Sequence, residues 1–208
     1  IPSCAIWDAI IAFRGALESS EGVLIIAGTG SVVYAQSRDG RQVRAAGWGP
    51  LVPSEWGADQ IARMALAATV EVEDGRARPS PLTRRLRRIT GLPDIFAFVN
   101  TTRSGVASLA AHVGRTALHD AMARKILRES AFQMSRAVCA VLRKADLHNR
   151  PANVSYAGSV FKSGKYVLGP LKEFLKKSCP KAVLKAPKHE PIYGAYLLAR
   201  ELDEGRIR

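Results

Sequence analysis

The amino-acid sequence predicts an α/β fold with a mixed sheet flanked by helices. Three short apolar segments that turn on glycines occupy residues 23–46, which is typical of consecutive strands. Apolar residues then recur at helical spacing as far as about residue 145. After Pro151, strand-like and helix-like segments alternate up to a last helix. Strands followed by alternating strand and helix units indicate one mixed sheet with helices packed on it.

The chain opens with a short helix and then enters the strands. An apolar stripe predicts the helix at residues 8–17, and the run VLIIA predicts a strand covered on both faces at residues 23–27. Two further strands are expected at residues 32–36 and 42–46, joined by an Asp-Gly turn at residues 39–40. These segments therefore predict three consecutive strands connected by tight turns.

Helical patterns fill the middle of the chain, and a shorter series of strands and helices ends it. Asp120 is the predicted start of the longest helix. Helices are expected from residue 55 and at residues 79–93, 106–113 and 120–145. The later strands and helices are expected at residues 153–157, 171–177, 182–184 and 192–202. Gly194 and Ala195 give the last helix a small face that favours close packing.

The composition limits the class of protein. The chain has 208 residues, of which 47% are hydrophobic, and this excludes a disordered tail. No apolar run reaches the roughly 18 residues of a membrane-spanning helix, so no membrane partner is expected. The 31 Lys and Arg outnumber the 18 Asp and Glu, and the net charge of +13 raises the question of a nucleic-acid partner. The basic runs at residues 84–88 and 162–188 lack a nucleic-acid-binding signature, so the sequence argues against such a partner.

The N-terminus and the cysteines bear on processing and compartment. The chain begins at Ile1 without the segments of a signal peptide, so we expect a fragment or a processed chain. Cys4, Cys139 and Cys179 form no CxxC pair, which predicts unpaired thiols and a reducing, cytoplasmic compartment. The four histidines show neither HxH nor HExxH spacing, so no protein-bound metal site is predicted.

The strongest local motif is Gly28-Thr29-Gly30-Ser31, directly after the buried strand. Glycines let the backbone approach an anion closely, and successive N–H groups with the two hydroxyls can bind phosphate oxygens. The motif is neither a Walker loop nor GxGxxG. A simple turn between two strands is the alternative interpretation.

Three polar or aromatic residues on either side of this motif in the sequence are candidates for a sugar site. Asp8 could act as a general base, although a carboxylate at a helix start also serves as an N-cap. Trp48, followed by Gly49, could pack on a sugar ring, or it could fold onto the core. Glu55 could accept hydrogen bonds from a polyol, or it could favour a helix start through the helix dipole.

In order and spacing, these motifs resemble one family. Gly158-Ser159 at a strand-to-turn junction and Gly194-Ala195 in the last helix complete the pattern. The chain is similar to the BadF/BadG/BcrA/BcrD ATPase family, which includes the N-acetylglucosamine kinases and belongs to the sugar kinase/Hsp70/actin superfamily. The resemblance covers about residues 2–202, except 71–103. It implies that residues 1–208 form a ribonuclease H-like C-terminal lobe, with a helical insertion at about residues 55–115.

The resemblance also implies roles and a reaction. Asp8 matches the catalytic Asp, the turn at residues 28–31 matches the second phosphate motif, and Trp48, Gly49 and Glu55 fall in the sugar-side segment. Transfer of the γ-phosphoryl group of ATP to a sugar hydroxyl is implied, with Mg²⁺ carried by ATP and a small-molecule sugar as substrate.

The resemblance also implies a motif for the adenosine of the nucleotide, and a homodimer and an N-terminal lobe are considered as assembly partners. Gly158 and Ser159 match the adenosine motif. A homodimer is one assembly that the resemblance allows. An N-terminal lobe with an Asp-Gly-Gly-Gly-Thr loop is the expected partner of the nucleotide cleft, and the sequence contains no such segment. Alone, therefore, this lobe is not expected to turn over ATP.

Other departures from the family keep alternatives open. Trp7 replaces an Asn before the catalytic Asp, and Ser54 and Trp56 alter the family's Asp-Glu-Gly-Ser segment. The alternatives to a sugar kinase are an ATPase that activates another protein, a non-catalytic homologue, and a nucleic-acid-binding module. The activators usually carry a cysteine pair that binds a cluster, and no two cysteines here are close in sequence.

Overall fold

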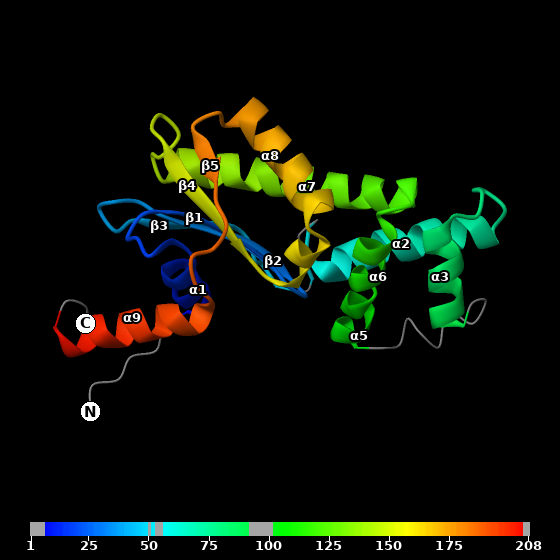
Figure 1. The fold of residues 1–208 in the computed structure, drawn as a ribbon, viewed down its shortest axis with the longest axis horizontal. Helices are drawn as coiled ribbons and strands as arrows, with labels where there is room; N and C mark the ends of the chain where they lie inside the picture. The colour runs from blue at the N-terminus through cyan, green and yellow to red at the C-terminus, as the bar shows by residue number, and fades with distance from the viewer. Residues whose placement is uncertain (1–6, 50, 53–55, 92–101, 206–208) are drawn as a thin grey trace.

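A computed structural model of the chain describes residues 7–49, 51–52, 56–91 and 102–205. Its centre is a five-stranded sheet with the strand order β3-β2-β1-β4-β5 (Figure 1). The strands are β1 (Gly22–Ala27), β2 (Ser31–Gln36), β3 (Gln42–Ala46), β4 (Ala152–Ala157) and β5 (Ala182–Leu184). All five lie within two residues of their predicted positions.

The sheet is mixed, as predicted. β1 pairs antiparallel with β2, and β2 pairs antiparallel with β3. On its other side β1 pairs parallel with β4, and β4 pairs parallel with β5. The parallel pairs need crossover connections, which the long helical segments supply.

Helices cover both faces of the sheet. Figure 1 shows α7 and α8 on one side, and α1 with α9 on the other. α1 lies between the sheet and α9. Their bounds are α1 (Asp8–Leu17), α7 (Ala121–Lys144), α8 (Lys165–Ser178) and α9 (Pro191–Asp203), with the short 3-10 helix η1 (Ser159–Ser163) before α8. Among the described residues, no helix combines the length and the apolar character that crossing a membrane requires.

Four more helices extend from one end of the sheet (Figure 1). They are α2 (Ala58–Glu73), α3 (Pro81–Thr90), α5 (Arg103–Ser108) and α6 (Ala110–Thr116). The single helix predicted at residues 106–113 is in fact two, which meet at Leu109, because Leu109 is turned into the core and both helices pack against α2. The helix predicted at residues 171–177 begins six residues earlier and contains Pro170.

Two apolar clusters, one on each face, explain why β1 is apolar throughout. Val23 and Ile25 belong to the large cluster that α7 and the neighbouring helices cover. Leu24 belongs to a smaller cluster with Phe13 of α1 and Tyr34 of β2. Successive side chains of a strand point to opposite faces, so a strand covered on both sides must be apolar at every position.

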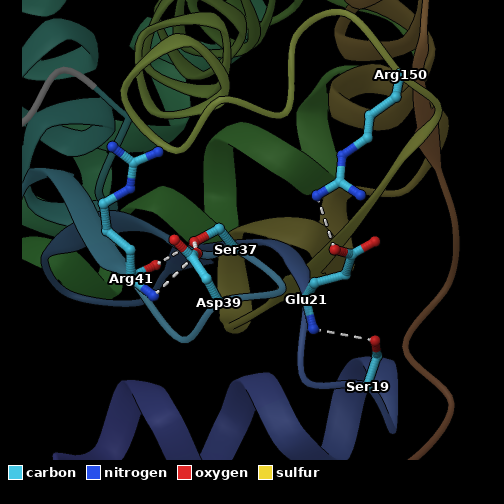
Figure 2. A network of polar contacts seen from close by, with 6 residues as sticks. All are labelled: Ser19, Glu21, Ser37, Asp39, Arg41 and Arg150. Carbon is cyan, nitrogen blue, oxygen red and sulfur yellow. Dashed lines mark hydrogen bonds and ion pairs between the residues drawn. The ribbon is translucent and has the colours of Figure 1, made fainter.

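Polar contacts hold the end of the sheet opposite the glycine-rich turn (Figure 2). In the β2–β3 turn, the Ser37 hydroxyl donates to the Asp39 carboxylate and lies 3.1 Å from the Arg41 carbonyl oxygen. Beside it, Arg150 Nη2 donates to Glu21 Oε2 at 2.9 Å, just before β1. The first contacts lie within the β2–β3 turn, and the ion pair joins the entry to β1 with the entry to β4.

The cysteine prediction is wrong for two of the three residues. Cys139 of α7 and Cys179 at the end of α8 form a disulfide, with their Cα atoms 6.1 Å apart. They are 40 residues apart in the sequence, so spacing could not reveal a pair that depends on the packing of α7 against α8. The cysteine argument for a reducing compartment therefore fails. Cys4 lies outside the described residues.

Asp120 joins the starts of two helices, and its carboxyl makes their stability depend on pH. It caps α7 by accepting from the Ala123 N–H at 2.9 Å, and it accepts from the Leu82 N–H of α3 at 2.7 Å. Burial alone would raise the pKa of this carboxyl, but the donors from Ala123, Leu82 and Ser80 outweigh burial and hold the pKa below its usual value.

We expect Asp120→Ala to lower the free energy of unfolding by about 2 kcal/mol at pH 7. A carboxyl with a depressed pKa in the folded state contributes stability above its unfolded pKa, near 3.8, and loses it as the pH falls through the folded value. The difference between wild type and Asp120→Ala in urea unfolding should therefore shrink below about pH 4. A difference that is equal at pH 7 and pH 3 would contradict this assignment.

Candidate functional site

The turn predicted to bind phosphate is the tip of the β1–β2 hairpin. Within the turn, the Gly28 N–H donates to the Gly30 carbonyl at 2.9 Å. Thr29 is exposed, and among the described residues the N–H groups of Thr29 and Gly30 donate to no backbone carbonyl. Ser31 is buried as the first residue of β2. The tip therefore offers two neighbouring N–H donors to an incoming anion.

The first turn of α2 is attached to this phosphate hairpin (residues 28–31). The Ala58 N–H donates to the Gly28 carbonyl at 2.8 Å, and the Asp59 N–H donates to the Thr29 carbonyl at 3.1 Å. A Cβ on Gly57 would lie 2.9 Å from the Thr29 carbonyl oxygen, so only glycine allows this approach. The positive end of the α2 dipole thus lies against the hairpin, where it favours a bound anion.

The predicted adenosine motif touches the same hairpin. Gly158 has φ +110°, and a Cβ there would lie 2.3 Å from the Ala27 carbonyl oxygen and 3.0 Å from the Gly28 nitrogen. The next residue, Ser159, lines a cavity of about 580 Å³ together with Ala58 of α2 and residues of α5 and α6. Gly158 therefore lies directly against the start of the hairpin turn, and Ser159 lines a cavity beside it.

Asp8 is exposed at the start of α1. The N-cap position belongs to Trp7, and no side chain makes a capping hydrogen bond there. Among the described residues, the side chain of Asp8 has no hydrogen bond or ion pair. Its carboxylate is therefore not used as a cap and is available as a hydrogen-bond acceptor.

Of the residues predicted on the sugar side, the structure describes Trp48 and Gly49. Trp48 is 69% exposed, and the Arg44 guanidinium lies over its ring at 4.5 Å from the centroid. Trp48 and Trp56 line a cavity of about 600 Å³ whose other walls come from β3, α7 and the end of α8, while Gly49 is exposed with φ +95°. Trp56 is only 3% exposed and packs in the main core, so it does not project into solvent. Glu55 and Ser54 lie outside the described residues.

The sequence did not single out several residues at this site. Lys162 and Ser163 line the same cavity as Ser159, and Asp59 and Arg103 form an ion pair beside the hairpin. The Gly158-Ser159 motif could have drawn attention to Lys162 and Ser163, whereas nothing in the spacing of residues 59 and 103 indicated a contact. In the part of the chain that the structure describes, no group of three potential ligands could hold a metal ion.

Another cavity, of about 310 Å³, gathers basic side chains of α3 and α6, including Arg84, Arg85, Arg88 and Arg115. Arg85 Nε donates to His112 Nδ1 at 2.8 Å. Burial, together with the charges of Arg85 and Arg115, lowers the pKa of His112, so the ring is a neutral acceptor near pH 7. The arginines themselves are exposed, as expected for a solvated face.

A known protein family matches the segment of the chain that contains these motifs. The sequence profile of the BadF/BadG/BcrA/BcrD ATPase family matches residues 4–199. The chain belongs to this family. The matched range includes residues 28–31, Gly158-Ser159 and Asp8. The family that these motifs predicted for this BadF/BadG/BcrA/BcrD member is therefore confirmed.

Individual relatives agree with the family assignment. An N-acetylmuramic acid/N-acetylglucosamine kinase of Clostridium acetobutylicum is 28% identical over 200 residues, which are 93% of this chain and 65% of the relative. A crystal structure described as an N-acetylglucosamine kinase of Chromobacterium violaceum superposes with a TM-score of 0.73 at 27% identity, covering 92% of this chain and 64% of that one. This family member thus spans about two thirds of the length of each.

A more distant structure shows how general the fold is. A ROK family glucokinase of Streptomyces griseus, solved with glucose and AMPPNP, has a TM-score of 0.59 at 19% identity and matches 93% of this chain and 67% of the glucokinase. At that identity the likeness concerns the fold alone. The five-stranded mixed sheet with its helices is therefore the lobe fold found in sugar kinase structures.

Proposed function

We propose that this chain is the C-terminal lobe of an ATP-dependent sugar kinase of the N-acetylglucosamine kinase type. The observation that carries the proposal is the contact between Gly158 and the Ala27–Gly28 backbone. It brings the hairpin proposed to bind phosphate close to the cavity proposed for the nucleoside. A nucleotide needs both features at adjacent positions, because its phosphates and its base are covalently joined.

The residues at this edge fit a nucleotide. The N–H groups of Thr29 and Gly30 would bind phosphate oxygens, and Ser159, Lys162 and Ser163 would line the nucleoside cavity. ATP would supply the phosphoryl group, and the Mg²⁺ that it carries would neutralise part of the charge on the phosphates. The chain's own part is to position the phosphates and to exclude water, since phosphoryl transfer depends mainly on positioning and electrostatics.

Asp8 is proposed to accept the proton of the attacking sugar hydroxyl. A general base needs an oxygen that can accept the proton of the substrate hydroxyl, and among the described residues no partner occupies this carboxylate. Trp48, Gly49 and Glu55 remain the proposed sugar-side residues. N-acetylglucosamine is the proposed sugar because it is named for the Clostridium relative. An N-terminal lobe that carries the first phosphate loop is proposed to complete the cleft, which would close around the bound substrates.

The rival functions have less support. A cluster-binding activator would need cysteines together, and Cys139 and Cys179 are joined to each other instead. The exposed arginines of α3 are the structural observation that favours a nucleic-acid module. A salt-sensitive shift of DNA or RNA in a gel, abolished by Arg84→Ala and Arg88→Ala together, would support that module instead.

The test of the catalytic assignment compares two carboxylate variants. With the N-terminal lobe present, N-acetylglucosamine should stimulate ADP release. Asp8→Asn should lower kcat by roughly 100-fold to 10,000-fold, because it removes the proton acceptor. Asp146→Asn is the matched control: Asp146 is exposed, and its φ of +56° is a conformation that asparagine also adopts.

Two outcomes would reject parts of this proposal. If no hexose stimulates ADP release, the chain is not part of a sugar kinase. If Asp8→Asn and Asp146→Asn both keep wild-type turnover, the kinase function stands but Asp8 is not its general base.

A further inference from the structure

The guanidinium of Arg103 covers the tip of the phosphate hairpin. Arg103 is the first residue of α5, after the capping residue Thr102. A Cβ placed on Gly30 would lie 3.3 Å from Arg103 Nη2 and 3.9 Å from Nη1. The two terminal nitrogens of Arg103 therefore face the hairpin, at the point where glycine leaves space for them.

Asp59 holds this guanidinium in place. Arg103 Nε donates to Asp59 Oδ2 at 3.3 Å, and Arg63 Nε donates to Asp59 Oδ1 at 3.1 Å. Asp59 is only 3% exposed. Its own N–H donates to the Thr29 carbonyl, so one residue fixes both the hairpin backbone and the arginine above it. A buried carboxylate that orients an arginine reduces the entropy lost when the arginine binds a ligand.

The charges in this cluster do not cancel. Two guanidinium groups share the single carboxylate of Asp59, which leaves one positive charge uncompensated within the cluster. The Arg103 side chain is 35% exposed. Among the described residues, its terminal nitrogens Nη1 and Nη2 donate to no acceptor. A planar fork with unused donors is the geometry that binds phosphate oxygens in pairs.

We propose that Arg103 binds the polyphosphate tail of the nucleotide at the tip of the hairpin, and that Asp59 is its positioning residue. This inference rests on the proposed function, because it assigns a ligand to the same cleft. Arg103 adds a charged fork to the N–H groups of Thr29 and Gly30. The site should therefore prefer nucleoside di- and triphosphates to the nucleoside, and the preference should come from this side chain.

The test measures, by calorimetry, the binding of ADP and of adenosine to this chain with the N-terminal lobe present, as in the activity assay. Arg103→Ala should weaken ADP binding by about tenfold or more, the effect expected for a lost charge-assisted hydrogen-bond pair. Adenosine binding should not change, because adenosine has no phosphate. Arg103→Lys should restore only part of the affinity, since an ammonium group cannot bind Asp59 and a phosphate with one planar fork. Arg84→Ala removes the same charge from exposed α3 and should bind both ligands like wild type.

Asp59→Asn separates positioning from a purely structural role. It keeps the size of the side chain and the N–H to Thr29, so ADP binding should weaken while adenosine binding and the melting temperature stay close to wild type. The double variant with Arg103→Ala should bind ADP no more weakly than Arg103→Ala alone, because Asp59 acts through Arg103.

The outcomes separate this inference from the function on which it rests. If wild type binds both ligands and Arg103→Ala binds ADP with wild-type affinity, the role of Arg103 is overturned and the nucleotide site stands. An equal loss of ADP and adenosine affinity in Arg103→Ala also overturns it, because the residue would then act on the whole fold. Wild type that binds neither ligand overturns both the inference and the nucleotide site.

Discussion

Gly194→Ala should destabilise the protein by about 3 kcal/mol, although alanine is the better helix former. A Cβ on Gly194 of α9 would lie 2.0 Å from the Ile11 carbonyl oxygen and 2.6 Å from the Gly15 nitrogen of α1. Both obstacles are backbone atoms, so no side-chain rotation relieves them, and α9 must move off α1. The thermal midpoint should fall by roughly 6–12 °C, and amide hydrogen exchange should accelerate first in α9.

Ala199→Gly is the matched control in the same helix. Ala199 is exposed, so removing its Cβ should cost only the propensity difference of about 1 kcal/mol. If packing did not matter, Gly194→Ala would instead raise stability by a similar amount. A Gly194→Ala midpoint at or above that of wild type would show that the two helices do not cross this closely.

Gly158→Ala should weaken nucleotide binding. The φ of +110° is strained for any residue with a side chain, and the new Cβ would lie 2.3 Å from the Ala27 carbonyl oxygen. The end of β4 must then move away from the phosphate hairpin, which separates the nucleoside cavity from the phosphate donors. We expect this separation to weaken ADP binding by about tenfold to 100-fold, that is by about 1.4–2.8 kcal/mol, as measured by calorimetry.

Gly75→Ala distinguishes this displacement from a general loss of stability. Gly75 also has a positive φ, +74°, but its Cβ would meet no atom within 4 Å. Gly75→Ala should lower the melting temperature modestly, because a residue other than glycine in the left-handed conformation lowers the stability by roughly 1–2 kcal/mol. Its ADP affinity should equal that of wild type. Equal affinities in Gly158→Ala and Gly75→Ala would place the nucleotide elsewhere.

Local patterns predicted a helix or strand correctly where the residues of its buried face set its pattern. The apolar stripe of residues 8–17 became α1 without change, because that stripe is the face packed on the sheet. The run at residues 23–27 became β1, since a strand between two helical layers has no polar position. The sequence indicates Asp120 as a helix start, since a capping carboxylate binds an N–H only a few residues away. In the structure this is the N–H of Ala123.

Prediction failed where a distant partner decides the structure. The division at Leu109 results from packing on α2, which leaves no local signal. The Cys139–Cys179 bond joins two helices across 40 residues of sequence. Asp59 and Arg103 are 44 residues apart, and neither stands in a recognisable motif. Such contacts depend on the arrangement of complete elements rather than on the residues within one of them.

By itself, the sequence determined the α/β class, the order of strands and helices, and the family motifs, because periodicity, turn chemistry and glycine spacing are local properties. The tertiary structure alone decided that Gly158 lies against Gly28, that α2 begins on the phosphate hairpin, and that Arg103 is held above Gly30 by Asp59. These contacts join segments that close only when the sheet and its helices pack, so no local pattern can encode them.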